Sequence, residues 1–271
     1  MSDTRTPDRL ADARTLWELL ERRTALTPDA PMLIQELPAD RPDQRAGEAP
    51  DHGTGARDRV LSFREVRDRA EWVAAGLHAE YGVGEGSRVA WQLPTRVETV
   101  LVSLAPARLG AVQTPIIALY RGAEVGRILR ESQAQLLLVP GVRRDFDHPR
   151  LAAELTADWP APPQVRTTHA EADLPQGDPG TLPAPPRTDL SDERSPVRWV
   201  FSTSGSTAAP KGARHTDRTL IAGGAGLAEA MGTGPRDVGS IAFPYRRPRP
   251  PAARRPSGAH RAAQGPHHSQ G

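Results

Sequence analysis

The residues best suited to chemistry form one short run in the last third of the chain. Residues 203–212 read Thr-Ser-Gly-Ser-Thr-Ala-Ala-Pro-Lys-Gly, and Lys211 is the only lysine among 35 lysine and arginine residues. Small residues let a backbone approach a ligand, hydroxyl and N–H groups donate hydrogen bonds, and an ammonium group supplies a compact charge. The run therefore predicts a phosphate-binding loop whose contacts are Thr203, Ser204, Gly205, Ser206, Thr207, Lys211 and Gly212.

Three other interpretations of this run fit less well. A Walker-type loop needs G-x-x-x-x-G-K-[ST], but Pro210 replaces its second glycine and Gly212 replaces its Ser/Thr. The G-x-S-x-G motif of serine hydrolases is absent around Ser204. A plain turn would not need a hydroxyl-bearing residue or glycine at five consecutive positions after an apolar segment. Phosphate binding is therefore the interpretation that this run favours.

Alternating apolar segments around the loop predict an α/β domain with a largely parallel sheet. Capping-box patterns begin at Thr15, Ser62 and Thr95. Pro106 should kink the third of these helices or end it early. The predicted helices cover about 15–25, 62–80, 95–110, 122–132 and 216–231. The predicted strands cover 31–36, 60–61, 87–93, 111–115, 135–139 and 197–201.

Side-chain patterns also predict a core. One helix face carries Val66, Ala70, Val73, Ala74 and Leu77. We expect core positions for the four tryptophans in helix and strand patterns, which are Trp17, Trp72, Trp91 and Trp199. His215 is expected to be a structural residue at the start of the last helix rather than a base.

Composition excludes several kinds of site. The chain has no cysteine, so disulfides and thiolate nucleophiles are ruled out. Its eight histidines form no H-x-x-x-H pair, and no metal site is predicted. No apolar run approaches the ~18 residues of a membrane span, and the polar start lacks the apolar region of a secretory signal. We expect a cytoplasmic protein.

Two loops and a tail interrupt the predicted domain. Residues 38–58 suggest a flexible surface loop, and residues 159–196, with nine prolines, an extended connection. Residues 246–271 hold six arginines, no acid, and no large aliphatic or aromatic side chain. Such a segment cannot bury enough apolar surface to order itself. We therefore expect a folded part over 1–245 and a disordered tail over 246–271.

The tail has two interpretations. Its arginine and proline content is typical of a frameshifted, GC-rich reading frame. The apolar segment directly before it, residues 241–245, is expected to form a core strand and its exit. Alternatively, it is a genuine basic tail that binds a polyanion. It lacks aromatic residues for stacking on bases, so nucleic-acid binding is not favoured. The net charge of +2 falls to −4 without its six arginines, so the basic character belongs to the tail.

The loop and its surroundings resemble one known group of proteins. Residues 203–207 and 210–212, followed by His215 and Thr216, resemble the signature loop of the adenylate-forming (AMP-binding) superfamily. That superfamily includes acyl-CoA synthetases, adenylation domains of peptide synthetases and luciferases. Residues 61–65, 109–115 and 124–139 resemble further family segments, and the likeness covers roughly residues 12–245. Ala208 departs from the pattern, since the family usually has glycine there.

The resemblance implies both a fold and an activity. The fold would be the incomplete N-terminal subdomain of an adenylate-forming enzyme. The reaction would join a carboxylic acid to ATP, with Mg²⁺, to give acyl-AMP and pyrophosphate, and then pass the acyl group to coenzyme A. The loop would stabilise charge on the pyrophosphate leaving group and would supply no catalytic residue.

Other parts of the family pattern are not found in this sequence. The resemblance also implies an adenine pocket, a glutamate for magnesium, an aspartate for the ribose and a second, catalytic lysine. The chain has no second lysine, so we expect it to be inactive alone. The alternative is a non-enzymatic nucleotide- or polyanion-binding protein that retains only the phosphate loop. Acid-dependent pyrophosphate exchange would distinguish the two.

Overall fold

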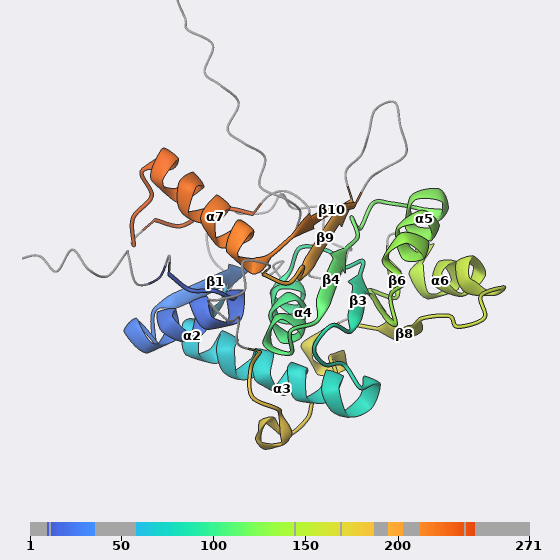
Figure 1. The fold of residues 1–271 in the computed structure, drawn as a ribbon, viewed down its shortest axis with the longest axis horizontal. Coiled ribbons are helices and arrows are strands. Elements are labelled where there is room, and N and C mark those ends of the chain that lie inside the picture. The colour runs from blue at the N-terminus through green and yellow to red at the C-terminus, as the bar shows by residue number, and fades with distance from the viewer. Residues whose placement is uncertain are drawn as a thin grey trace, which may run out of the picture.

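The centre of the molecule is a six-stranded sheet (Figure 1). The structure is a computed structural model that describes residues 10, 12–35, 58–143, 145–168, 170–186, 195–202, 212–235 and 237–241. Neighbouring strands follow the order β10-β9-β4-β3-β5-β8, and only the β10–β9 pair is antiparallel. The prediction of an α/β fold with a mostly parallel sheet is therefore confirmed. The strands are β3 (Arg88–Trp91), β4 (Val112–Pro115), β5 (Leu136–Val139), β8 (Gln164–Thr167), β9 (Trp199–Ser202) and β10 (Gly212–His215).

Helices cover both faces of this sheet. One layer contains α2 (Leu16–Leu26), α3 (Phe63–Tyr81) and α4 (Val97–Arg108), and the other contains α5 (Gly122–Ser132) and α6 (His148–Thr156). Strand side chains alternate between the two cores: Val89 and Trp91 join the first, and Ala90 joins the second. Burial on both sides explains why these strands read as continuous apolar runs.

The longest helix, α3, forms where its sequence signals lie. Ser62 Oγ accepts a hydrogen bond from the Glu65 N–H, and the Glu65 carboxylate accepts one from the Ser62 N–H, which completes a capping box. The helix ends at Gly82, whose φ of 63° suits glycine. Its predicted apolar face is buried as expected, at Val66, Ala70, Val73, Ala74 and Leu77.

The start of α4 differs from the prediction. The helix begins at Val97 with Arg96 as its N-cap residue, so the box predicted at Thr95 is wrong; Gln35 Oε1 accepts the Val97 N–H instead, at 2.8 Å. Pro106 lies in the last turn, where a missing N–H costs one hydrogen bond, and the helix continues to Arg108. The predicted end at Gly110 is two residues late.

Several short elements were not foreseen. Strand β8 lies inside the proline-rich connection predicted over 159–196 and pairs with β5 at the sheet edge. Its polar sequence and exposed side chains give no apolar signal. Helix α6 and strand β10 were missed as well. Beside the main sheet, β1 (Pro31–Gln35) pairs with β2 (Arg59–Ser62), β6 (Val142–Arg143) pairs with β7 (Phe146–Asp147), and two 3-10 helices cover Glu171–Asp173 and Pro179–Thr181.

Three of the four tryptophans that were predicted to lie in the core are buried there. Trp17, Trp91 and Trp199 are buried, but half of Trp72 is exposed because it lies on the solvent side of α3. Ile241, placed by the sequence in a core strand, is exposed and lies in no strand. The predicted flexible loop falls outside the described residues except for Asp58, as do residues 242–245 and the tail over 246–271. No helix in the described ranges is long and apolar enough to cross a membrane.

Removing the cap of α3 should weaken the fold in a pH-dependent way. We expect Ser62→Ala to lower the free energy of unfolding by about 1 kcal/mol at neutral pH. The hydrogen bonds from Ser62 hold the pKa of Glu65 below its ordinary value of 4.5. The contribution of these hydrogen bonds to the stability of the fold is therefore complete at pH values above 4.5. It is lost as the pH falls through the lower pKa that Glu65 has in the folded state. Urea titrations of the variant and the parent at pH 7 and pH 3 measure the difference in their free energy of unfolding. An equal difference at the two pH values would contradict the prediction.

Gly76 of α3 should tolerate no side chain. An added Cβ would lie 2.3 Å from the backbone of both Pro175 and Gln176. We expect Gly76→Ala to destabilise the protein by about 2–3 kcal/mol, because the backbone contact cannot yield without moving the segment after Glu171–Asp173. Gly223→Ala, in α7 (Asp217–Met231) with no atom within 4 Å of the new Cβ, is the matched control. It should stabilise by about 0.5–1 kcal/mol in the same urea titration.

Candidate functional site

The two strands that flank the predicted phosphate loop are paired with each other. Ser202 of β9 lies opposite Gly212 of β10, and the antiparallel register continues to Trp199 opposite His215. Residues 203–211, including the predicted contacts Thr203, Ser204, Gly205, Ser206, Thr207 and Lys211, lie outside the described residues. The structure therefore fixes where this loop leaves and rejoins the sheet. We call β9, β10 and the intervening residues the β9–β10 hairpin.

Gly212 is the one predicted contact residue that the structure describes. It is the first residue of β10, and an added Cβ would lie 2.8 Å from Val200 Cγ1. A side chain at this position would therefore force the Val200 side chain to shift.

The helix after the loop forms where the sequence predicted it, since α7 covers Asp217–Met231, but a strand that was not predicted, β10, lies between the loop and this helix. We expected a strand, a loop and then a helix, the arrangement that aims helix N–H groups at a phosphate. Instead β10 returns antiparallel to β9, and α7 starts only after it, with Thr216 as its N-cap. The start of α7 therefore lies at the end of the hairpin opposite the loop. Phosphate binding would depend on the loop's own N–H groups, hydroxyls and lysine.

The hairpin joins the sheet through backbone and side-chain contacts at its base. Between β4 and β9, within the described residues, one register pair is formed, Gln113 opposite Trp199. The Gln113 N–H donates to the Arg198 carbonyl at 2.7 Å. The Arg198 guanidinium donates to the Gly110 carbonyl and pairs with Glu85 at 2.7 Å. Gln113 itself is fully buried, so this junction is rigidly packed.

A buried carboxylate completes the base of the hairpin. Asp217 is 5% exposed. Its Oδ1 accepts the indole N–H of Trp199 at 2.7 Å, and its Oδ2 accepts the backbone N–H of Leu16 at 3.1 Å. Burial raises the pKa of Asp217, while the hydrogen bonds from Trp199 and Leu16 and the charge of Arg198 oppose that rise. Asp217 was not foreseen from the sequence, although an acid in the first turn of a helix was a visible signal.

Aromatic rings run from this base along the hairpin. Trp199 stacks on Phe201 with centroids 5.8 Å apart, and Phe201 contacts the edge of His215 at 5.6 Å. His215 is the last residue of β10 rather than the first of a helix, and its packing agrees with the structural role predicted for it.

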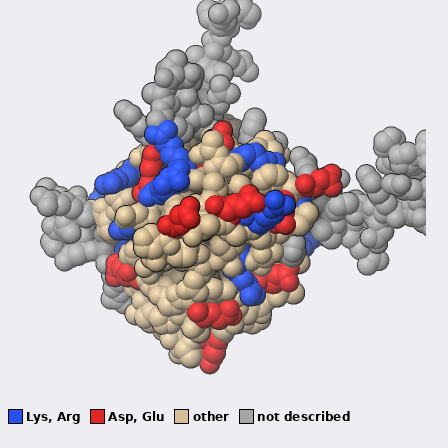
Figure 2. All heavy atoms as spheres, turned by 90° about the vertical axis from the view of Figure 1, so that its right-hand side faces the viewer, with Lys and Arg blue, Asp and Glu red and all other residues tan. Residues whose placement is uncertain are grey.

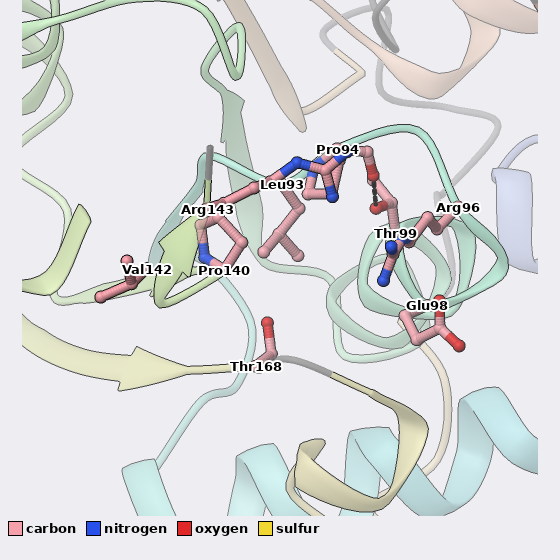
Figure 3. Close-up of a pocket in the computed structure, with 9 residues that line it drawn as sticks. All are labelled: Leu93, Pro94, Arg96, Glu98, Thr99, Pro140, Val142, Arg143 and Thr168. Carbon is pink, nitrogen blue, oxygen red and sulfur yellow. Dashed lines mark hydrogen bonds between the residues drawn. The ribbon is translucent and has the colours of Figure 1, made fainter. Parts of the chain in front are cut away.

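A second candidate site is a crevice of about 260 Å³ at the carboxyl edge of the sheet. The chain leaves β3 into α4 on one face and leaves β5 toward α6 on the other, so the crevice opens at a switch point of the topology. Open α/β sheets bind ligands at such points. Figure 3 shows Arg96 and Thr99 at the start of α4, Arg143 of β6 facing them, and Thr168 below.

The crevice wall is held by an ion network. Glu98 of α4 pairs with Arg59 at 2.7 Å, Arg59 also pairs with Glu171, and Arg69 reaches both oxygens of Glu171 at 2.7 and 2.8 Å. Arg96 and Arg143 both line the crevice, and the Glu98 carboxylate that also lines it is paired with Arg59.

Comparison with known proteins agrees with this architecture. The family described as AMP-binding enzyme matches residues 20–245. The chain is 33% identical over 180 residues to a salicyl-AMP ligase / salicyl-S-ArCP synthetase of Mycobacterium tuberculosis, covering 61% of this chain and 28% of that protein. It is 30% identical over 202 residues to a probable CoA ligase of Humulus lupulus, covering 69% and 34%.

Solved structures show the same fold. A long-chain-fatty-acid-CoA ligase from Archaeoglobus fulgidus superposes with a TM-score of 0.63 at 19% identity, covering 83% of this chain and 41% of that chain. The N-terminal subdomain of Klebsiella oxytoca NpsA gives 0.53 at 18% identity, covering 77% and 44%. The chain thus spans about a third of the length of these two curated ligases. Since the family match includes well over half of its residues, this chain belongs to the AMP-binding enzyme family.

Proposed function

We propose that the chain carries the ATP-phosphate-binding segment of a ligase that activates a carboxylic acid as acyl-AMP and transfers it to coenzyme A. The observation that supports the proposal is the position of the two residues that flank the lysine-containing loop. Ser202 and Gly212 hold its two ends together at the carboxyl edge of a parallel sheet. In open α/β sheets this edge is where ligands bind.

The chemistry assigned to the loop is electrostatic. A carboxylate that attacks the α-phosphorus of ATP displaces pyrophosphate, and negative charge builds on the leaving group. The hydroxyls of Thr203, Ser204, Ser206 and Thr207, the loop N–H groups and the Lys211 ammonium would donate hydrogen bonds to that charge. Gly205 lets the backbone approach the phosphates, and Gly212 closes the loop. No residue of the loop is assigned a covalent role.

Magnesium enters this proposal only as the ion that accompanies ATP. Within the described ranges, no group of three His, Asp or Glu side chains is arranged to hold a metal ion.

The crevice at the switch point supports a site for more than one substrate. It opens at the same edge of the sheet as the loop, and Arg96 and Arg143 line it. We assign it to an anionic group of the acid or of coenzyme A. The proposal names carboxylic acids only as a class, because the matched relatives are named for different acids or for none.

Surface charge favours a nucleotide over an extended polyanion. On the face that carries α5 and α6, acidic and basic side chains are interspersed (Figure 2). Arg127 pairs with Glu131 at 2.9 Å and Arg150 with Glu154 at 2.7 Å, which neutralises both helices. A protein that binds polyanions along this face would need a continuous basic surface. Non-enzymatic nucleotide binding remains the second candidate, and acid-dependent exchange of pyrophosphate into ATP separates it from the ligase.

Lys211 should determine affinity for ATP. We expect Lys211→Ala to raise the dissociation constant for MgATP about tenfold or more, because charge-assisted hydrogen bonds to the phosphates are lost. Lys211→Arg should recover little of the loss, since a planar guanidinium does not replace a compact ammonium. Isothermal titration calorimetry of the full chain measures both variants.

The matched control for Lys211 is Arg150→Ala, which removes a positive charge from the exposed surface of α6. It should leave the dissociation constant unchanged. If Lys211→Ala binds MgATP as tightly as the parent, or if both variants lose affinity equally, the loop does not hold the phosphates.

A further inference from the structure

Helix α7 is apolar along most of its length, yet it is largely exposed. Residues 221–228 carry no polar side chain, and within the helix only Asp217 and Ile221 are buried. The helix is attached at its start, where Asp217 accepts the Leu16 N–H, and the rest extends away from the sheet (Figure 1). A helix of such composition is normally covered on all sides. The exposed part of α7 is therefore a candidate contact surface.

One face of α7 is shaped for close contact. Leu220, Gly223, Gly224, Leu227 and Met231 lie on this face, because they follow helical spacing. Leu220 packs against the first core, while Met231 is 64% exposed. An added Cβ at Gly223 or Gly224 would meet no other element within 4 Å. Glycine weakens a helix relative to alanine but lets another backbone approach closely, and no described residue of this chain uses that space.

The outer face of the β1–β2 sheet is a second exposed apolar surface. Ile34 lies opposite Val60 in the register, and each is about half exposed. The neighbouring pair, Leu33 and Leu61, packs against the first core on the other face. Among the described residues neither strand pairs with a third, and a two-stranded sheet is only marginally stable alone. Both surfaces border α2, because β1 follows it in the chain and α7 contacts it.

Two long segments outside the described residues are poor candidates for covering these surfaces. Residues 38–57 and 246–271 contain no Ile, Leu, Val, Met, Phe, Trp or Tyr. Because the free energy of such a contact scales with the apolar area that both sides bury, these segments would gain little from it.

A solved structure indicates what kind of element would cover them. The chain matches less than half of the N-terminal subdomain of Klebsiella oxytoca NpsA, so more than half of that subdomain has no counterpart in the match. Two portions of one compact unit share a buried contact, and each must present apolar surface to the other. In this chain, α7 and the outer face of β1–β2 present such surface.

We propose that the exposed face of α7 and the outer face of β1–β2 bind a separate polypeptide, equivalent to the portion of the N-terminal subdomain that the match does not include. This partner would place apolar side chains against Leu227 and Met231 and a strand edge beside β1 or β2. The inference goes beyond the proposed function, because it does not depend on the phosphate loop or on ATP.

Complex formation is tested with the full chain and a named partner. The partner is the part of the Mycobacterium tuberculosis salicyl-AMP ligase that follows its 180 matched residues. We expect sedimentation velocity to show a 1:1 complex with a dissociation constant of about 1 μM or below.

Substitutions on the two surfaces should weaken this complex. We expect Met231→Asp and Ile34→Asp each to raise the dissociation constant about tenfold or more, because each places a charge in an apolar contact. Leu119→Asp is the matched control, since Leu119 is also 64% exposed but lies between β4 and α5. It should change the dissociation constant less than about twofold.

Gly223→Leu separates a contact role from a structural one. The space around its Cβ is open, so the substitution should raise the melting temperature of the chain alone, because leucine favours a helix more than glycine does. It should nevertheless weaken the complex about tenfold, because the larger side chain prevents close approach. A variant that is more stable but binds less tightly cannot owe its loss of affinity to unfolding.

Three results would overturn the proposal. The first is the absence of a complex, and the second is a complex that Met231→Asp and Ile34→Asp weaken no more than Leu119→Asp does. The third is a dimer of the chain alone that Met231→Asp dissociates, since a second copy would then cover the surface. None of these results bears on MgATP binding, so the proposed function is judged separately.

Discussion

Burial of the central sheet on both faces is the constraint on which the rest of the structure depends. Strand β3 pairs with β4 on one side and β5 on the other, and its residues alternate between two separate cores. Parallel strands of this kind require helical connections, and right-handed crossovers place α4 and α5 on opposite faces. The crevice beside Arg96 and Arg143 follows directly, because the chain turns away from β3 and β5 in opposite directions.

At the carboxyl ends of the strands, the sheet must accommodate polar backbone groups that are not part of the core. A loop that holds phosphates needs accessible N–H groups, and such groups are hard to accommodate inside a packed core. The fold places the two ends of the predicted phosphate loop, Ser202 and Gly212, at the carboxyl edge of the sheet, where β9 and β10 pair antiparallel. Rigidity then has to come from buried contacts at the hairpin's base, which Gln113, Arg198 and Asp217 provide.

Charge is used in two distinct ways in this molecule. On exposed helices, pairs such as Arg150 with Glu154 are solvated and contribute little to stability. The partly buried group of Arg59, Arg69, Glu98 and Glu171 instead connects β2, α3, α4 and the segment near β8. Such a network fixes the relative position of its elements more than it adds free energy, which suits the wall of a binding crevice.

The sequence by itself determined the fold class and the positions of most helices and strands, and it predicted a phosphate-binding role for residues 203–212. Each of these depends on local signals: the capping box at Ser62, the apolar run of β5, and a lone lysine among hydroxyl residues. Only the tertiary structure placed β8 and β10, since edge strands with polar side chains carry no hydrophobic pattern. It also decided that Asp217 meets Leu16, 201 residues away, because a long-range hydrogen bond has no local sequence signature. Local patterns reflect backbone preference and burial, whereas the joining of distant segments depends on how the whole sheet is assembled.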